Sequence, residues 1–259
     1  MRTLHGMLKR ITQVGLSCLL VTSMSACAGF LGFGGDSWKE EVLLHDGQKI
    51  IVERAVKRAG RHELGQRSAI SEQSLSFNLP SNNQRVIWKD EFSEDIGSGN
   101  FNPMLLEILG NAYVLASPAG CLSYNKWGRP NPPYVVFKYQ NKEWKRIPLQ
   151  ELPAEIKLPN LVISSPDDVA KDAGYGLLSA ERIKRENTGF SQSEYQTILR
   201  EPIRSAGEGC IKTDYYGSAG WLSSDWFTDK PSLGACLEFC NRKEISTEYC
   251  PCNRFFKGR

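Results

Sequence analysis

The sequence lacks an apolar run long enough to predict a membrane-spanning helix. Such a helix needs about 20 predominantly apolar residues. The first apolar stretch, residues 11–22, is interrupted by Thr12, Gln13 and Ser17, and no second stretch follows it. An uncleaved N-terminal anchor is the alternative that this stretch leaves open.

The sequence also has few residues suited to catalysis. It contains three histidines; His45 lies in the loop-like triplet His45-Asp46-Gly47, and His62 lies in a charged stretch. Neither belongs to a zinc-protease helix motif or lies near a Gly-x-Ser-x-Gly elbow. We therefore assign no catalytic residue, no metal and no cofactor, and we favour a non-enzymatic protein.

An excess of positive charge is missing as well, once an N-terminal signal is set aside. The whole chain has 32 basic and 29 acidic side chains. Residues 1–26 contain Arg2, Lys9 and Arg10 and no acid, which leaves 29 of each sign. Because nucleic-acid binding depends on basic residues that release counterions, we expect no nucleic-acid partner.

What the N-terminus does contain is the layout of a secretory signal: basic residues, an apolar stretch and small residues before a cysteine. The tetrapeptide Met24-Ser25-Ala26-Cys27 resembles the lipobox of bacterial lipoproteins. The resemblance implies a signal peptide over 1–26, cleavage before Cys27, and acyl chains such as palmitate on that cysteine. Ala28, where an aspartate would favour retention, implies the outer membrane, with the body in the periplasm or at the cell surface.

Six cysteines remain after Cys18 is removed and Cys27 is lipidated, and an even number in an exported chain predicts disulfides. Cys236 and Cys240 would share a helix face, and Cys250 and Cys252 a strand face. We expect a ladder, Cys236 to Cys250 and Cys240 to Cys252, which resembles the cysteine-stabilised helix-and-strand motif of small secreted peptides. The remaining bond would join Cys121 to Cys210. A zinc site formed by the last four thiols is the alternative.

Turn signals between short β-rich segments predict a mainly β fold with a few short helices. Hairpins are expected around 45–47, 110–111 and 140–142, further strands at 74–79, 85–88 and 161–164, and helices at 179–187 and 193–200. Ser179 is the expected N-cap of the first of these helices. We divide the mature chain into a lipidated glycine-rich tether (27–37), an antiparallel, hairpin-rich body (38–202) and a small disulfide-stabilised module (203–259).

Three groups of side chains are candidates for binding. A loop around Asn131-Pro132-Pro133 contains the possible binding residues Tyr124, Trp127, Arg129 and Tyr134, although such loops also pack as structural plugs. The acidic residues Asp90, Glu91, Glu94 and Asp95 could bind calcium, but they lack the EF-hand pattern and favour a solvated loop. For the aromatic cluster Tyr215, Tyr216, Trp221, Trp226 and Phe227, a miniature core is the favoured interpretation.

The segments WKEEVLLHDGQKIIVER and NKWGRPNPPYVVFKY, with the stretch ending in YQTILREPI, resemble an uncharacterised family of proteobacterial lipoproteins over residues 38–202. The resemblance supplies no activity and no catalytic residues. We therefore expect an envelope lipoprotein that is anchored to the membrane by lipid and binds a protein or glycan partner or supports envelope structure. A hydrolase with a carboxylate site, and an inhibitor that acts through the cysteine-rich module, are the alternatives.

The first prediction concerns Cys27. Mass spectrometry of the N-terminal peptide of the mature protein should find a diacylglycerol on this residue and no residue before it. Cell fractionation should place the protein in the outer membrane. An unmodified Cys27, or a mature chain that starts elsewhere, would contradict the prediction.

Overall fold

The computed structural model describes residues 35–60 and 65–256. The predicted signal peptide, Cys27, most of the tether and His62 lie outside these residues. The described residues from Gly35 onward form one compact unit, and the proposed boundary at residue 203 inside that unit remains a prediction. Across the described ranges, none of the helices combines the length and the apolar character needed to cross a membrane.

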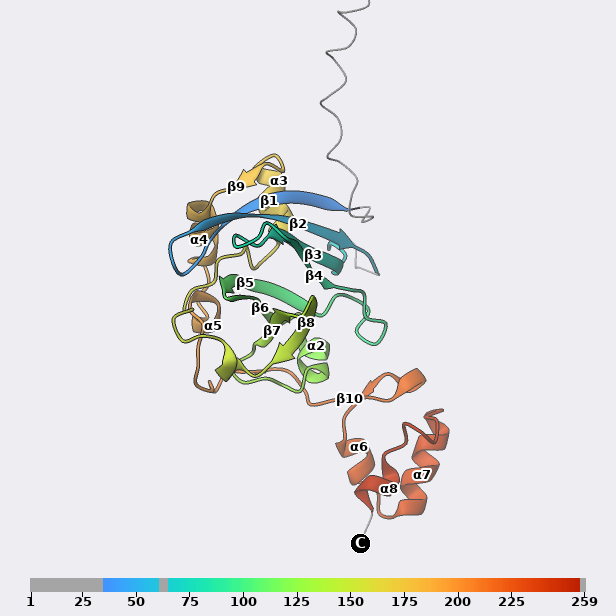
Figure 1. The fold of residues 1–259 in the computed structure, drawn as a ribbon. Coiled ribbons are helices and arrows are strands. Elements are labelled where there is room, and N and C mark those ends of the chain that lie inside the picture. Colours follow the sequence, from blue (N-terminus) through green and yellow to red (C-terminus); the bar gives the residue numbers. More distant parts are fainter. Residues whose placement is uncertain (1–34, 61–64, 257–259) are drawn as a thin grey trace, which may run out of the picture. The chain divides into compact units, whose positions relative to one another are not determined.

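Two large, mainly antiparallel sheets and a small two-stranded one confirm the mainly β prediction (Figure 1). The first sheet has the order β4-β3-β2-β1-β9 and the second the order β5-β6-β7-β8. Among the strands that the structure describes, only β9 and β1 pair in parallel. The strands are β1 (Asp36–Leu43), β2 (Lys49–Arg58), β3 (Ile70–Asn78), β4 (Arg85–Asp90), β5 (Phe101–Leu109), β6 (Asn111–Pro118), β7 (Val135–Gln140), β8 (Glu143–Ile147) and β9 (Leu177–Leu178).

The three predicted hairpins are present. The β1–β2 turn includes Gly47, and the β5–β6 turn is made at Gly110; both glycines have a positive φ. Between β7 and β8, Asn141 and Lys142 have φ of 55° and 65°. Positive φ at both central positions is the type I′ geometry whose twist matches the flanking strands.

The two sheets pack face to face through alternating apolar side chains. Because successive side chains of a strand point to opposite faces, Val42, Leu75 and Trp88 of the first sheet meet Leu106 and Val114 of the second in one buried cluster. Trp88, Phe101 and Phe137 also place their rings 5.3–6.2 Å from one another. This inter-sheet cluster forms the centre of the body.

A row of buried polar side chains crosses the inward face of the first sheet. Glu40, Arg54, Gln73 and Asp90 come from β1 to β4 in that order, and all are buried. Arg54 Nη1 lies 3.2 Å from Glu40 Oε1, Arg54 Nη2 donates to Gln73 Oε1, and Gln73 Nε2 donates to Asp90 Oδ2. On one side of the row lies the inter-sheet cluster; on the other lies an apolar cluster that includes Trp38 and Val56.

The segment expected to be a strand at 161–164 is not one. Its backbone groups bond to other segments instead. The Val162 carbonyl accepts a hydrogen bond from Arg54 at 2.6 Å, and the Val162 N–H donates to Glu40 Oε2 at 3.2 Å. The N–H of the preceding residue, Leu161, donates to Met104 O. Met104 is the extra residue of a bulge in β5. Leu161, Val162 and Ile163 belong to three different apolar clusters, so this tripeptide ties the layers of the body together.

Short helices cover the outer parts of the sheets. They are α2 (Cys121–Lys126), α3 (Pro166–Asp172), α4 (Ala180–Asn187) and α5 (Ser193–Gln196), with a 3-10 turn, η1 (Leu149–Glu151). The predicted N-cap is confirmed, since the Ser179 side chain accepts from Arg182 N. α5 is shorter than expected because the chain is extended from Thr197 onward.

The cysteine-rich part has an apolar cluster of its own. Its elements are β10 (Asp214–Tyr215), η2 (Gly217–Ala219), β11 (Trp221–Leu222), α6 (Asp225–Thr228), α7 (Leu233–Arg242) and α8 (Cys252–Phe255). Tyr216 and Phe227 of the aromatic cluster are buried there, with ring centroids 4.6 Å apart. Trp226 is instead 47% exposed, so the aromatic cluster is only partly a miniature core.

The predicted Cys121–Cys210 bond is present, but the predicted ladder is wrong. The bonds are Cys236–Cys252 and Cys240–Cys250, with Cα separations of 5.7 and 5.9 Å. After α7 the chain reverses direction. Cys240, near the end of α7, therefore pairs with Cys250, the first cysteine after the reversal. Cys236 pairs with Cys252, so one bond is nested inside the other. Moreover, Cys252 begins a helix instead of continuing a strand.

The same bonds argue against the zinc alternative. The sulfurs of Cys240, Cys250 and Cys252 lie within 4.8 Å of one another, a separation that would suit a metal. Zinc requires thiolate ligands, and these sulfurs are already joined in disulfides.

The second prediction concerns the buried ion pair. Arg54→Met leaves the Glu40 carboxylate buried without its cation, so we expect the free energy of unfolding to fall by about 3–5 kcal/mol. The control is Arg85→Met, because the Arg85–Glu53 pair is exposed and its loss should cost at most about 1 kcal/mol. Denaturant unfolding followed by tryptophan fluorescence measures both. Equal losses in the two variants would contradict the assignment.

Candidate functional site

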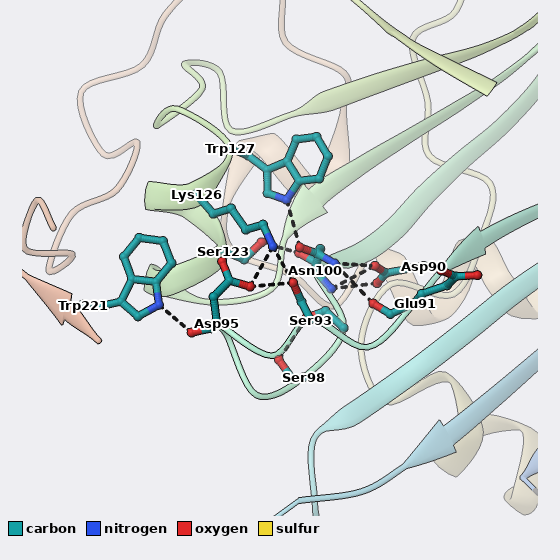
Figure 2. A network of polar contacts seen from close by, with 11 residues as sticks. Asp90, Glu91, Ser93, Asp95, Ser98, Asn100, Ser123, Lys126, Trp127 and Trp221 are labelled. Carbon is teal, nitrogen blue, oxygen red and sulfur yellow. Dashed lines mark hydrogen bonds and ion pairs between the residues drawn. The ribbon is translucent and has the colours of Figure 1, made fainter. Parts of the chain in front are cut away.

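The acidic run starts at Asp90, the last residue of β4, and continues into the loop that connects β4 to β5; Figure 2 shows Asp90, Glu91 and Asp95. The loop does not assemble these acids as calcium ligands. Asp90 is buried and accepts hydrogen bonds from the backbone N–H groups of Asn100 and Phe101 and from Asn100 Nδ2. Burial raises the pKa of Asp90, although these hydrogen bonds oppose the shift. Glu91 and Glu94 are exposed.

Asp95, Ser93 and Lys126 form a compact polar group at this loop (Figure 2). Ser93 Oγ donates to Asp95 Oδ1 at 2.7 Å, Lys126 Nζ lies 2.8 Å from the same carboxylate oxygen, and Lys126 also donates to Ser93 Oγ. Burial alone would raise the pKa of Asp95, but the hydrogen bonds from Lys126 and Ser93 outweigh it, and the pKa is lowered.

A serine beside a lysine is also the arrangement of some acyl-transfer enzymes, in which a neutral lysine activates the serine. Here the Lys126 ammonium contacts the Asp95 carboxylate and donates to Ser93 Oγ, while the Ser93 hydroxyl donates to Asp95. A charged ammonium has no lone pair with which to accept the Ser93 proton. The group therefore has the chemistry of a structural ion pair.

The cysteine-rich part of the chain attaches at this same place. Cys121, the first residue of α2, is bonded to Cys210. Asn125 Nδ2 donates to Ile211 O at 2.9 Å and to Thr213 Oγ1 at 2.8 Å, and Trp221 Nε1 donates to Asp95 O at 2.6 Å. The β4–β5 loop and α2 thus form an attachment site, which we define by Asp95, Cys121 and Asn125.

The predicted aromatic binding loop follows α2 directly, and its rings are used in packing. Trp127 lies 4.6 Å from Phe101 between ring centroids, and its Nε1 donates to Asn100 Oδ1. Tyr124 is buried, with the Arg129 guanidinium 4.9 Å from its ring centroid. These contacts match the structural-plug alternative; a binding role for the loop remains a prediction.

Tyr134, the fourth residue of the predicted loop, is buried beneath α5. Its hydroxyl donates to Glu194 O at 2.7 Å and accepts from Leu199 N. Burial raises the pKa of Tyr134 to about 12, so the phenol stays protonated at physiological pH. Tyr134 therefore holds the segment after α5 to the second sheet.

Two hollows are candidates for ligand sites. The first, of about 410 Å³, lies beside the loop just described and is lined by Pro130, Asn131, Pro132, Tyr134, Val135 and residues 146–150. The second, of about 450 Å³, lies in the cysteine-rich part and is lined by Asp214, Tyr215, Tyr216, Glu248, Tyr249, Cys250, Pro251 and Arg254. The second brings together more ionisable and aromatic side chains and is the stronger candidate.

His45 has a buried partner that the sequence did not reveal. Its Nδ1 lies 2.9 Å from Glu107 Oε1, and its backbone N–H donates to Glu107 Oε2. The hydrogen bond to Glu107 raises the pKa of His45, and burial opposes the shift. The pair connects the β1–β2 turn to β5, 62 residues later. This contact gives His45 a structural role.

Sequence reasoning missed Asn125 of the attachment site and Lys126 beside it. Lys126 and Asn125 gave no signal of their own, because nothing local distinguishes them from exposed polar residues. The expected Cys121–Cys210 bond was the available signal, since it forces the neighbours of Cys121 against those of Cys210.

Comparison with protein-family models, with curated proteins and with solved structures finds no match to this chain.

The third prediction concerns the His45–Glu107 pair. Because the folded-state pKa of His45 is raised, the pair contributes stability that is fully present below the unfolded pKa of about 6.5. That contribution should be lost as pH rises through the folded pKa. Glu107→Gln should return the His45 pKa, measured by NMR titration, toward its ordinary value and flatten this part of the stability profile. Glu53→Gln, at an exposed position, is the control and should change neither.

Proposed function

We propose that this protein is a non-enzymatic envelope lipoprotein that binds its partner through the cysteine-rich part, residues 203–259. One observation carries the proposal. This part presents half-exposed aromatic side chains on a frame closed by two disulfides, with Tyr215 39%, Tyr249 45% and Trp226 47% exposed. Exposed aromatic side chains on a rigid frame favour recognition, because tyrosine and tryptophan are enriched among the residues that dominate binding energy.

The covalent chemistry supports the export that the proposal requires. All six cysteines after Cys27 are paired. Disulfides of this kind persist in secreted and periplasmic proteins and are rare in the cytosol. Together with the lipobox at Met24–Cys27, they favour a mature protein attached by lipid to the outer membrane, with its body in the periplasm or at the cell surface.

The hydrolase alternative draws no support from the described carboxylates. The buried acids Glu40, Glu107 and Asp167 contact Arg54, His45 and Arg58 respectively. Asp90 is surrounded by donors from residues 100 and 101. A glycosidase needs one free carboxylic acid and one free carboxylate that face a shared cleft, whereas these carboxylates are engaged separately.

Trp226 favours a second candidate, an inhibitor that inserts a residue into its target. Its ring meets Phe239 edge-on at 6.4 Å between centroids, and Lys243 lies 5.7 Å from its ring centroid. These contacts hold a large exposed ring in a fixed position on α6. In both candidates the binding surface belongs to the same part of the chain.

The fourth prediction tests where the partner binds. A photo-crosslinking amino acid is placed in living cells at Trp226, Leu237 or Glu248 of the cysteine-rich part, and at Leu43 or Ile51 of the first sheet as matched exposed controls. Crosslinked species of higher mass should arise from the first group only. Crosslinks from Leu43 and Ile51 alone, or from none of the five positions, would contradict the proposal.

A further inference from the structure

We propose that the hollow in the cysteine-rich part is a glycan-binding site that holds one or two uncharged sugar residues. This inference rests on the proposed binding function and names the chemical class of its partner. The hollow measures about 450 Å³, within the range of small-ligand sites. It lies between the β10–β11 hairpin and the segment 248–254.

Two tyrosines supply the apolar faces that a sugar ring needs. Tyr215 lies 5.7 Å from Trp221 between ring centroids, which fixes its orientation on the hairpin. Tyr249 lies directly over Gly217, where an added Cβ would come within 3.1 Å of its ring. A tyrosine ring combines an apolar face with a polar hydroxyl, so it can pack against the C–H face of a sugar.

The polar side chains of the hollow supply both donors and acceptors. Asp214 accepts from Ser224 Oγ at 2.7 Å through Oδ2, and Glu248 and Arg254 are exposed at the rim. Sugar hydroxyls can donate to the carboxylates and accept from the guanidinium, and such charge-assisted bonds are the stronger ones.

Tyr216 is the buried member of the lining of the hollow. Its side chain is buried, and its hydroxyl oxygen has no partner of normal hydrogen-bond geometry among the described residues. The nearby Ser224 hydroxyl donates to Asp214 instead. Tyr216 lines the hollow, but its hydroxyl oxygen is shielded from solvent, so Tyr216 offers a ligand its ring and not its hydroxyl.

The charges decide between ligand classes. Tyrosine faces also attract cations, but Arg254 lies at the rim of the hollow and disfavours an ammonium or guanidinium ligand. Two carboxylates, Asp214 and Glu248, disfavour an anion. An uncharged ligand with many hydroxyl groups avoids both penalties and still uses every charged side chain of the site.

The disulfides keep the site in its binding shape. Cys250 lines the hollow and is bonded to Cys240 of α7, and Cys252, two residues later, is bonded to Cys236. The wall that carries Glu248 and Tyr249 is therefore anchored before a ligand arrives. Less conformational entropy is lost on binding to such a preorganised site.

The fifth prediction uses the full lipidated chain in detergent. Maltotriose, cellotriose and tri-N-acetylchitotriose are titrated by saturation-transfer NMR, with glucose and N-acetylglucosamine as the monosaccharide arm. At least one trisaccharide should bind, and its affinity should exceed that of the monosaccharides. Tyr249→Ala should weaken binding at least about tenfold, or 1.4 kcal/mol.

Phe92→Ala is the matched control, since Phe92 is an equally exposed ring, 47% exposed, that does not line the hollow. It should leave binding unchanged. Retained disulfide pairing, checked by non-reducing peptide mapping, shows that each variant is folded. Failure of all three trisaccharides to bind at about 10 mM, far above the Kd of a specific site, or full binding by Tyr249→Ala, would overturn the inference.

Failure of the inference is distinguishable from failure of the proposed function. If Glu248 crosslinks to a protein partner and this chain binds no trisaccharide, the glycan inference is wrong but the proposed binding function stands. If new reducing ends are released from a bound trisaccharide, the protein hydrolyses glycans. The non-enzymatic function is then wrong, but the glycan site stands.

Discussion

The buried ion pair between Glu40 and Arg54 is the contact on which most of the body depends. Two charges taken out of water are tolerated only if each finds partners, and here both find Val162: Arg54 donates to its carbonyl and Glu40 accepts from its N–H. The pair thereby fixes the tripeptide 161–163, whose side chains enter three separate apolar clusters. Loss of the pair would free a segment that several layers share.

The polar row that starts at this pair also positions the attachment site. Gln73 connects Arg54 to Asp90, and Asp90 holds the start of β5 through the N–H groups of residues 100 and 101. The ends of the β4–β5 loop are therefore fixed, and Asp95 within it contacts Lys126 and Trp221. The polar row thus fixes the ends of the loop whose Asp95 contacts the cysteine-rich part.

The Cys121–Cys210 bond makes that attachment permanent. It closes a loop with a sequence separation of 89 residues, for which chain-entropy arguments give about 4–5 kcal/mol of stabilisation. The cysteine-rich part has a small apolar cluster, and small units of this kind generally need disulfides to stay folded. Its own two bonds supply this constraint, while the third holds it to a much larger folded body, an arrangement suited to presenting a binding surface.

The sequence by itself determined what depends on neighbours a few residues away. Alternating apolar residues and turn-forming residues predicted the three hairpins, and Ser179 predicted the start of α4. Cysteine parity predicted complete pairing, and pairing the last four cysteines with one another left Cys121 to bond Cys210. Only the tertiary structure decided the rest: the reversal after α7 set the nested partners of Cys250 and Cys252, and packing placed Asp95, Lys126 and Trp221 together. The physical reason is the distance in sequence over which each interaction acts. Backbone propensities act between near neighbours. The partners of a buried charge, a cysteine or a tyrosine hydroxyl come from distant segments that meet only after the chain has folded.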